Sequence, residues 1–288
     1  MGVIRIDGVS FSYEDALDAR KNADDQVQAD YVLDNVCLEV PDGQFLCLIG
    51  HSGCGKSTLL RLLLGLSQPT KGAIYVDDRK VDGPDLDRSI VFQNYSLFPW
   101  MKARQNVEFG VEQASKLLGR GLTKEQIRQR ADEYLAKVDM ADAADKYPYQ
   151  LSGGMQQRVA IARALAMDTD ILFFDEPFGA LDVRTRRSLQ QLVDELWRSG
   201  SRRKTVVFVT HDISEAILLA DRVVFMGHGR VLEDIDVDIP RPRNREELRR
   251  NPRAEALRAR LTDLFYQDGP ADDLDQADAE LFDSEDER

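Results

Sequence analysis

The sequence predicts an α/β fold built on a mainly parallel β-sheet, and three observations lead to this prediction. Short runs rich in β-branched and aromatic residues alternate with runs of helical period, as in chains whose strands are joined by helices. A glycine-rich segment follows one apolar run and opens a helical run. Between about 94 and 168 the strand signals stop and polar helical segments replace them, which predicts a helical insert in the core.

The individual elements follow from local patterns. Five apolar runs have the length of buried strands; they are Phe45–Ile49, Ser89–Phe92, Ile171–Phe174, Thr205–Thr210 and Arg222–Met226. The run Thr58–Leu66 is rich in leucine nearly all round, as expected of a helix buried against a sheet. Thr123 and Gln126 form a capping box for a helix over Thr123–Val138, and a short helix is predicted over Val159–Ala166.

Composition limits the class of protein. The chain has 288 residues, 43% of them hydrophobic and 31% charged, which is enough to bury a sizeable core. No stretch approaches the roughly 18–20 uncharged apolar residues that cross a bilayer, and the N-terminus shows no secretory signal. Cys37, Cys47 and Cys54 lack metal-ligand spacing, which fits a reduced, cytosolic protein. We expect Cys37 and Cys47 to be buried, because both lie in strand-like segments.

The formal charge of -13 is concentrated in two segments. Residues 268–288 hold ten acids and one arginine, and residues 14–30 hold six acids and two bases, so the rest is neutral overall. We expect an acidic loop at 14–30 and an acidic disordered tail at 268–288. These segments repel phosphates, so nucleic acid is not an expected partner. The main domain is predicted over 1–240, including a helical part at about 94–168, and a C-terminal helical extension over 241–267.

A glycine-rich loop matches the phosphate-binding pattern G-x-x-x-x-G-K-[ST] between a strand and a helix. Its glycines let successive N–H groups point inward, and the helix N-terminus adds positive potential. In this pattern Lys56 reaches the β- and γ-phosphates and the Ser57 hydroxyl binds Mg²⁺. His51 is expected to be exposed in this loop, and His228 to lie in a turn. The predicted cradle consists of Gly50, His51, Ser52, Gly53, Cys54, Gly55, Lys56, Ser57 and Thr58.

Two further segments carry groups that suit nucleotide hydrolysis. The apolar run Ile171–Pro177 ends in two carboxylates, Asp175 to hold the Mg²⁺ shell and Glu176 to polarise the attacking water. Upstream, the segment Leu151-Ser-Gly-Gly-Met-Gln-Gln-Arg158 places a serine and two glycines before a helix. Such a helix start is a second anion site, formed by Ser152, Gly153 and Gly154.

With these motifs in this order, the chain resembles an ATP-binding cassette (ABC) ATPase over roughly residues 3–265. The family's signature segment has the same Leu-Ser-Gly-Gly form, although Met155 stands where the family usually has glutamine. The resemblance implies a P-loop NTPase (RecA-like) core with a mainly parallel sheet, an antiparallel β subdomain and a helical signature subdomain. It also implies that residues 1–240 form the ATPase domain.

Other family positions are carried over motif by motif. Gln93 in Val-Phe-Gln-Asn resembles the Q-loop glutamine, which senses Mg²⁺ and water. Asp182 in Ala-Leu-Asp resembles the D-loop, which crosses the dimer seam, and His211 in Val-Thr-His-Asp resembles the switch histidine that contacts the γ-phosphate. Tyr13 is the favoured aromatic for stacking on adenine, and Tyr31 is the alternative.

In this family each ATP lies between the P-loop of one subunit and the signature segment of another. The resemblance therefore implies a head-to-tail homodimer that uses ATP and Mg²⁺. The implied catalytic residues are Glu176, His211, Gln93 and Lys56. The implied metal ligands are Ser57, Gln93 and Asp175. The opposite subunit would bring Ser152, Gly153 and Gly154, whose donors stabilise charge on the γ-phosphate.

The stretch Leu97–Asn106 resembles the Phe-Pro-Trp-Met segment of bacterial nitrate, sulfonate and taurine importer ATPases. This implies transmembrane permease subunits, a periplasmic or extracellular substrate-binding protein acting through the permease, and a peripheral location at the cytoplasmic face of the inner membrane. Phe98 and Trp100 are expected to line the groove that receives the permease, the alternative being that both pack inside the helical part. An ABC ATPase of an export or lipoprotein-release system is the alternative function, and the solute itself is not encoded.

Overall fold

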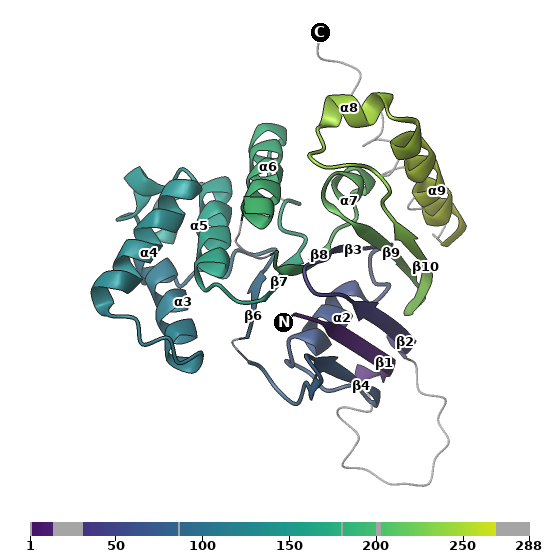
Figure 1. Ribbon diagram of the computed structural model, residues 1–288, viewed down its shortest axis with the longest axis horizontal. Helices are drawn as coiled ribbons and strands as arrows, with labels where there is room; N and C mark the ends of the chain where they lie inside the picture. Colours follow the sequence, from purple (N-terminus) through teal and green to yellow (C-terminus); the bar gives the residue numbers. More distant parts are fainter. Residues whose placement is uncertain (1, 14–30, 86, 180, 200–202, 269–288) are drawn as a thin grey trace.

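The computed structural model describes residues 2–13, 31–85, 87–179, 181–199 and 203–268. The predicted loop at 14–30 and the tail beyond Asp268 lie outside these residues. At the centre is a six-stranded sheet of order β10-β9-β3-β8-β7-β6 (Figure 1). Its strands are β3 (Phe45–Ile49), β6 (Arg88–Val91), β7 (Ile171–Asp175), β8 (Thr205–Val209), β9 (Arg222–Gly227) and β10 (Arg230–Asp236).

This sheet confirms the predicted mainly parallel arrangement. β3 pairs in parallel with β8 and β9, and β7 pairs in parallel with β8 and β6. The sixth strand of this sheet, β10, was not predicted, and it runs antiparallel to β9. Each of the five predicted strands is present with its ends within one residue of the expected bounds.

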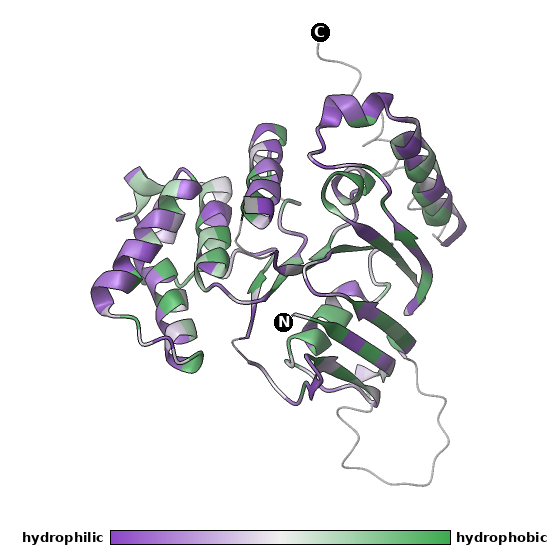
Figure 2. Cartoon of the chain, in the orientation of Figure 1, coloured by the Kyte–Doolittle hydropathy of each residue, from purple (hydrophilic) through white to green (hydrophobic). Residues whose placement is uncertain are grey.

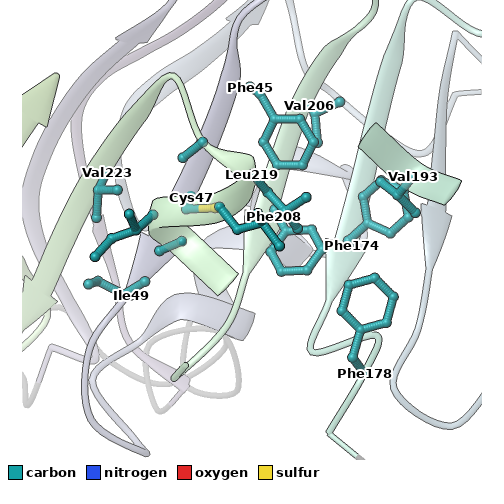
Figure 3. Close-up of a cluster of buried hydrophobic side chains, with 14 of the residues drawn as sticks. Phe45, Cys47, Ile49, Phe174, Phe178, Val193, Val206, Phe208, Leu219 and Val223 are labelled. Carbon is teal, nitrogen blue, oxygen red and sulfur yellow. The ribbon is translucent and has the colours of Figure 1, made fainter. Parts of the chain in front are cut away.

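Both faces of the sheet are covered, as parallel sheets require. The side chains of Phe45, Cys47 and Ile49 face one cluster of buried residues, while Leu46 and Leu48 face a second. Figure 3 shows the first cluster, which receives side chains from several helices. Those helices are α5 (Gly153–Ala166), α6 (Val183–Ser199), α7 (Ile213–Leu219), α8 (Arg245–Arg250) and α9 (Pro252–Asp268).

The opposite face packs on helix α2 (Lys56–Leu63) and on a second, antiparallel sheet of order β2-β1-β4-β5. Along β2, buried and exposed residues alternate with the period of a strand whose two faces differ, and Figure 2 shows hydrophobic and hydrophilic segments alternating on β1 and β2. The burial predicted for Cys37 is therefore wrong, because this alternation turns it outward, whereas Cys47 is fully buried. The strands are β1 (Ile4–Phe11), β2 (Leu33–Val40), β4 (Lys71–Val76) and β5 (Arg79–Lys80).

The predicted helical part contains α3 (Ala103–Leu117) and α4 (Lys124–Lys137), which pack with α5 around a third apolar cluster. Thr123 caps α4 and forms the predicted capping box with Gln126. The prediction for α5 was too short: the helix begins at Gly153, because the Ser152 side chain accepts a hydrogen bond from the N–H of Met155 and starts the helix there.

The C-terminal segment returns to the sheet. After β10, helices α8 and α9 follow, and α9 packs on α7 and β9. Asp268, predicted as the first residue of the tail, is the last residue of α9. Across the part of the chain that the structure describes, no helix has the length and apolar character needed to span a membrane.

Candidate functional site

The glycine-rich loop leaves the end of β3 and enters α2. Gly50, Gly53 and Gly55 have φ angles of 147°, 82° and 102°, which L-residues with side chains rarely adopt. A Cβ on Gly50 would also lie 2.0 Å from the carbonyl oxygen of Met226 on β9. The prediction that this backbone is closed to residues with a Cβ is therefore confirmed.

Lys56 is held at the start of α2, with 5% of its surface exposed. Its ammonium donates hydrogen bonds to the carbonyls of Gly50 (2.7 Å) and His51 (2.8 Å). The Cys54 sulfur lies 3.6 Å from the same ammonium, and burial raises the pKa of the Cys54 thiol. The loop thus folds back on the lysine and places a fixed positive charge in the cradle.

The outer residues of the loop face away from the core. Ser52, Gly53 and Ser57 are exposed. The Ser57 hydroxyl donates a hydrogen bond to Asp175 Oδ1 at 3.0 Å, which joins the start of α2 to the end of β7. These are the hydroxyl and the carboxylate that the sequence had assigned to one metal ion.

Tyr13 lies at the same helix start. Its hydroxyl hydrogen-bonds the hydroxyl of Thr58 at 3.1 Å, and its ring meets Phe11 edge-on with 47% of the residue exposed. The ring of Tyr31 instead lies under the Lys71 ammonium, 5.0 Å from the centroid. The contact with Thr58 favours Tyr13 over Tyr31 as the residue next to the cradle.

A carboxylate and an imidazole meet at the end of β7. Glu176 Oε2 lies 3.4 Å from Nδ1 of His211, which follows β8. The hydrogen bond from His211 lowers the pKa of Glu176, so the carboxylate stays ionised at neutral pH. Glu176 also has a φ of 44°, an uncommon conformation for a residue with a side chain. Burial raises the pKa of its neighbour Asp175, which still accepts the hydrogen bond from Ser57.

Gln93 follows β6 and is exposed, and a Cβ on Gly179, beyond β7, would lie 4.0 Å from its amide nitrogen. Tyr95 and Ser96, two and three residues further along, have φ angles of 55° and 47°. Arg163 of α5 holds them by donating to the carbonyls of Ser96 (2.9 Å) and Tyr95 (3.4 Å). The segment after Gln93 is therefore fixed to the helix that begins with the signature segment.

The signature glycines serve packing. Neither Gly153 nor Gly154 has a left-handed φ, but a Cβ on Gly153 would lie 2.8 Å from the Tyr95 hydroxyl. On Gly154, a Cβ would lie 2.8 Å from the side chain of Thr185 on α6. Ser152 is exposed at the helix start. Figure 1 shows α5 and α2 in different parts of the molecule, so the two candidate anion sites of the chain are apart.

Asp182 lies before α6, and Ala180 of the same motif lies outside the described residues. The Asp182 carboxylate accepts hydrogen bonds from the N–H groups of Arg184 (3.1 Å) and Thr185 (3.0 Å). It therefore stabilises the start of α6.

The expectation for His51 was wrong. This residue is half-buried, and its Nε2 lies 2.8 Å from the carbonyl oxygen of Phe265 on α9. The reason is that the C-terminal helix packs against the loop, which sequence spacing did not indicate. His228 lies in the turn between β9 and β10, as predicted.

The donors at this edge of the sheet fit Mg²⁺. No cluster of three or more His, Cys, Asp or Glu side chains suited to a metal occurs among the described residues. Ser57 and Asp175 supply one hydroxyl and one carboxylate instead. Mg²⁺ prefers oxygen ligands and usually takes one or two carboxylates, with phosphate oxygens and waters completing its shell.

Sequence reasoning missed a buried carboxylate beside His211. Glu215 is 4% exposed and accepts hydrogen bonds from Thr210 Oγ1 (2.7 Å) and Gln190 Nε2 (2.8 Å). The Asp212 N–H in turn donates to Thr210 Oγ1 at 3.1 Å, so the loop that carries His211 is tied to Glu215. Its position four residues after His211, on the first turn of α7, was the available signal.

Comparison with known proteins agrees with this geometry. A family described as ABC transporter matches residues 33–179. The nitrate import ATP-binding protein NrtD of Synechococcus elongatus is 47% identical over 244 residues, which cover 84% of this chain and 87% of that protein. The bicarbonate transport ATP-binding protein CmpD of the same species is 44% identical over 245 residues, covering 84% and 86%.

A solved structure of an ATP-binding cassette, dimeric in a post-hydrolysis state with ADP and phosphate bound, superposes with a TM-score of 0.68. It is 33% identical and covers 82% of this chain and all of that one. The fold and the loop thus define a P-loop nucleotide hydrolase. The chain belongs to the ABC transporter family and is an ATPase, as the signature motifs predicted. The alternative of an export or lipoprotein-release system is not favoured, because NrtD is named as a nitrate import protein and CmpD as a bicarbonate transport protein.

The buried carboxylate generates a prediction about pH. Burial, then the nearby Asp212 charge, raises the pKa of Glu215 from 4.5 to about 7. Three other titratable groups interact electrostatically with Glu215: Arg186, Arg245 and the Cys47 thiol. Between these two pKa values the folded protein keeps the Glu215 proton, whereas the unfolded chain releases it. The contribution of Glu215 to the free energy of unfolding is therefore largest below pH 4.5. It falls by about 3 kcal/mol as the pH rises to about 7.

Glu215→Gln should remove that loss. We expect its unfolding free energy, relative to wild type, to increase by about 3 kcal/mol between pH 4.5 and 7.5 in urea titrations. The matched control is Glu255→Gln on the exposed face of α9. A difference between Glu215→Gln and wild type that does not vary with pH would contradict the prediction.

A second prediction concerns Cys54, which is 7% exposed and beside the Lys56 ammonium. In a Cys37→Ser protein, N-ethylmaleimide should react slowly at Cys54, because the thiol is buried and its pKa is raised. The adduct should block nucleotide binding, and ATP should protect. Complete modification with unchanged ATPase activity would refute this. Cys54→Ser supplies the insensitive control.

Proposed function

We propose that this chain is the nucleotide-binding subunit of a membrane importer for a small anion or organic solute. The observation that supports this most directly is the meeting of a P-loop lysine and serine with the β7 carboxylates at one edge of the sheet, where Ser57 contacts Asp175 at 3.0 Å. The substrate class is supported by identities of 44–47% to subunits named for nitrate and bicarbonate transport.

We further propose that ATP binds with its phosphates in the cradle and its adenine on Tyr13. Lys56 neutralises phosphate charge, and the N–H groups of the loop point to the same anion. Mg²⁺, when bound, would be held by Ser57 and Asp175 with Gln93 nearby, and supplies charge neutralisation for the leaving phosphate. The exposed Tyr13 ring and its hydrogen bond to Thr58 support the adenine assignment.

In the proposed chemistry, Glu176 orients the attacking water and accepts its proton. Its lowered pKa keeps it available as an acceptor, and His211 Nδ1 fixes the carboxylate at 3.4 Å. The protein's contribution is mainly positioning and electrostatics, so an incomplete site hydrolyses slowly.

The complete site is proposed to form between two copies arranged head to tail. Within one chain, Ser152, Gly153 and Gly154 start a helix that lies apart from the P-loop helix (Figure 1). A second copy can place that helix N-terminus, with its positive potential, against the γ-phosphate. The dimeric cassette with ADP and phosphate supports this arrangement. The exposed Asp182, which caps α6, is proposed to lie at the seam.

The permease is proposed to dock beside the segment after Gln93. Trp100 is 69% exposed, while Phe98 packs edge-on against Phe109 of α3 at 5.0 Å. The sequence left two alternatives, a docking groove or packing inside the helical part. The exposure of Trp100 favours the first for that residue, and the packing of Phe98 on α3 favours the second for Phe98. We propose Trp100 as the contact, with the subunit at the cytoplasmic face of the inner membrane and a substrate-binding protein acting through the permease. Nucleic acid is not a proposed partner.

We propose the same division of the chain as the sequence indicated. Residues 1–240 form the ATPase domain, with the helical part at about 94–168, and residues 241–267 form the helical extension.

Glu176→Gln tests the proposed base. Because Gln cannot accept the proton, turnover should fall by roughly 100- to 10,000-fold, while binding of a fluorescent ATP analogue stays near wild type. Lys56→Ala is the companion variant and should lose nucleotide binding itself. Wild-type turnover by Glu176→Gln would overturn the assignment, and normal binding by Lys56→Ala would overturn the cradle.

Trp100→Ala tests the docking surface. An exposed tryptophan at the centre of an interface contributes strongly to binding, so affinity for the permease should fall by about 10-fold or more. The measurement is co-purification and titration against permease in detergent or nanodiscs. The control is Leu117→Ala; this residue is 64% exposed and is the last residue of α3. Equal losses for both variants, or none for Trp100→Ala, would contradict the proposal.

A further inference from the structure

The C-terminal helix reaches the phosphate-binding loop. Three contacts near its end carry this observation. The Nε2 atom of His51 lies 2.8 Å from the carbonyl oxygen of Phe265, and the two rings meet edge-on with centroids 5.0 Å apart. The Phe265 ring also meets Phe225 of β9 edge-on at 4.9 Å. Phe265 is therefore wedged between the loop and the strand that lies beside it.

A second anchor follows three residues later. Asp268 Oδ1 lies 3.1 Å from Nε2 of His228, and only 6% of the Asp268 side chain is exposed. The carboxylate is also packed on the backbone of Gly227, where a Cβ would lie 2.3 Å from it. Its negative charge is felt in the cradle, since it contributes to the raised pKa of Cys54. The last turn of α9 is thus held at two residues, Phe265 on the loop and Asp268 on the turn after β9.

His51 connects this helix to the lysine. Its ring contacts Phe265, while its backbone carbonyl accepts a hydrogen bond from the Lys56 ammonium at 2.8 Å. The Phe265 ring therefore packs on the residue that supplies one of the two carbonyls that orient Lys56.

We propose that α9 is a working part of the nucleotide site, in which Phe265 positions His51 and thereby the Lys56 ammonium. Phe265 lies outside residues 33–179, the part matched to the family, so this role belongs to the C-terminal extension. ATP binding is then coupled to the position of the last turn of α9. The inference rests on the proposed assignment of the cradle.

The test is a double-mutant cycle on nucleotide affinity in the full-length protein. Equilibrium titration with mant-ATP and Mg²⁺ is applied to Phe265→Ala, His51→Ala and the double variant, with thermal unfolding followed in parallel. We expect each single change to weaken binding by about five-fold, and the double variant to be no weaker than the weaker single one. Phe265→Tyr, which keeps the ring, should restore wild-type affinity.

Matched variants separate this role from mere stability. Arg253→Ala, which removes an ion pair to Asp238 at the opposite end of α9, should leave mant-ATP affinity unchanged. Phe265→Leu keeps the apolar contact with the core and should still weaken binding. This variant therefore tests the proposal if Phe265→Ala does not fold. Wild-type affinity in Phe265→Leu would overturn the proposal. So would a loss of mant-ATP affinity in the double variant equal to the product of the losses in the two single variants. Failure of the cradle assignment is recognised separately, by normal binding in Lys56→Ala.

Discussion

The close approach of two backbones at Gly50 is the constraint on which the rest of the site depends. The end of β3 passes so near β9 that any Cβ there would lie 2.0 Å from the Met226 carbonyl oxygen. Glycine alone fits, and the loop that follows curls back to hold Lys56 between two of its own carbonyls. Because β7 and β8 run parallel to β3, their carboxyl ends reach the same edge of the sheet. Asp175 and His211 therefore arrive beside the cradle without further adjustment.

Arg163 and Tyr95 connect the helical part to that edge. Arg163 of α5 holds the carbonyls of Tyr95 and Ser96, two residues in left-handed conformations, and the Tyr95 hydroxyl packs on Gly153. The segment after Gln93 is thus joined to the signature helix by direct contacts. Uncommon backbone conformations persist where the surroundings enforce them, and they concentrate at functional segments. For the proposed permease contact at Trp100, this arrangement provides a set of direct contacts from the segment after Gln93 to the signature helix.

Local patterns predicted most of the fold and the cradle, and long-range packing accounts for what they missed. Strand β3 and the helix after Lys56 follow from apolar runs and a glycine pattern, which are short-range signals. The contact of His51 with Phe265 joins residues 214 positions apart, so no spacing rule could indicate it. Cys37 was misplaced because an apolar strand was assumed to be buried on both faces, whereas β2 lies in a sheet with two different faces. Glu215 was overlooked because its role depends on Gln190 from another helix.

Assembly of the nucleotide site from two copies is the central claim, and the oligomeric state of the Glu176→Gln protein measures it directly. This variant is expected to bind ATP and to hydrolyse it slowly, so the nucleotide stays bound during the measurement. With saturating ATP and Mg²⁺, it should sediment as a dimer in analytical ultracentrifugation. Omitting ATP, or adding Lys56→Ala, should leave it monomeric. A protein that binds ATP normally but yields only monomer at saturating nucleotide would contradict the account.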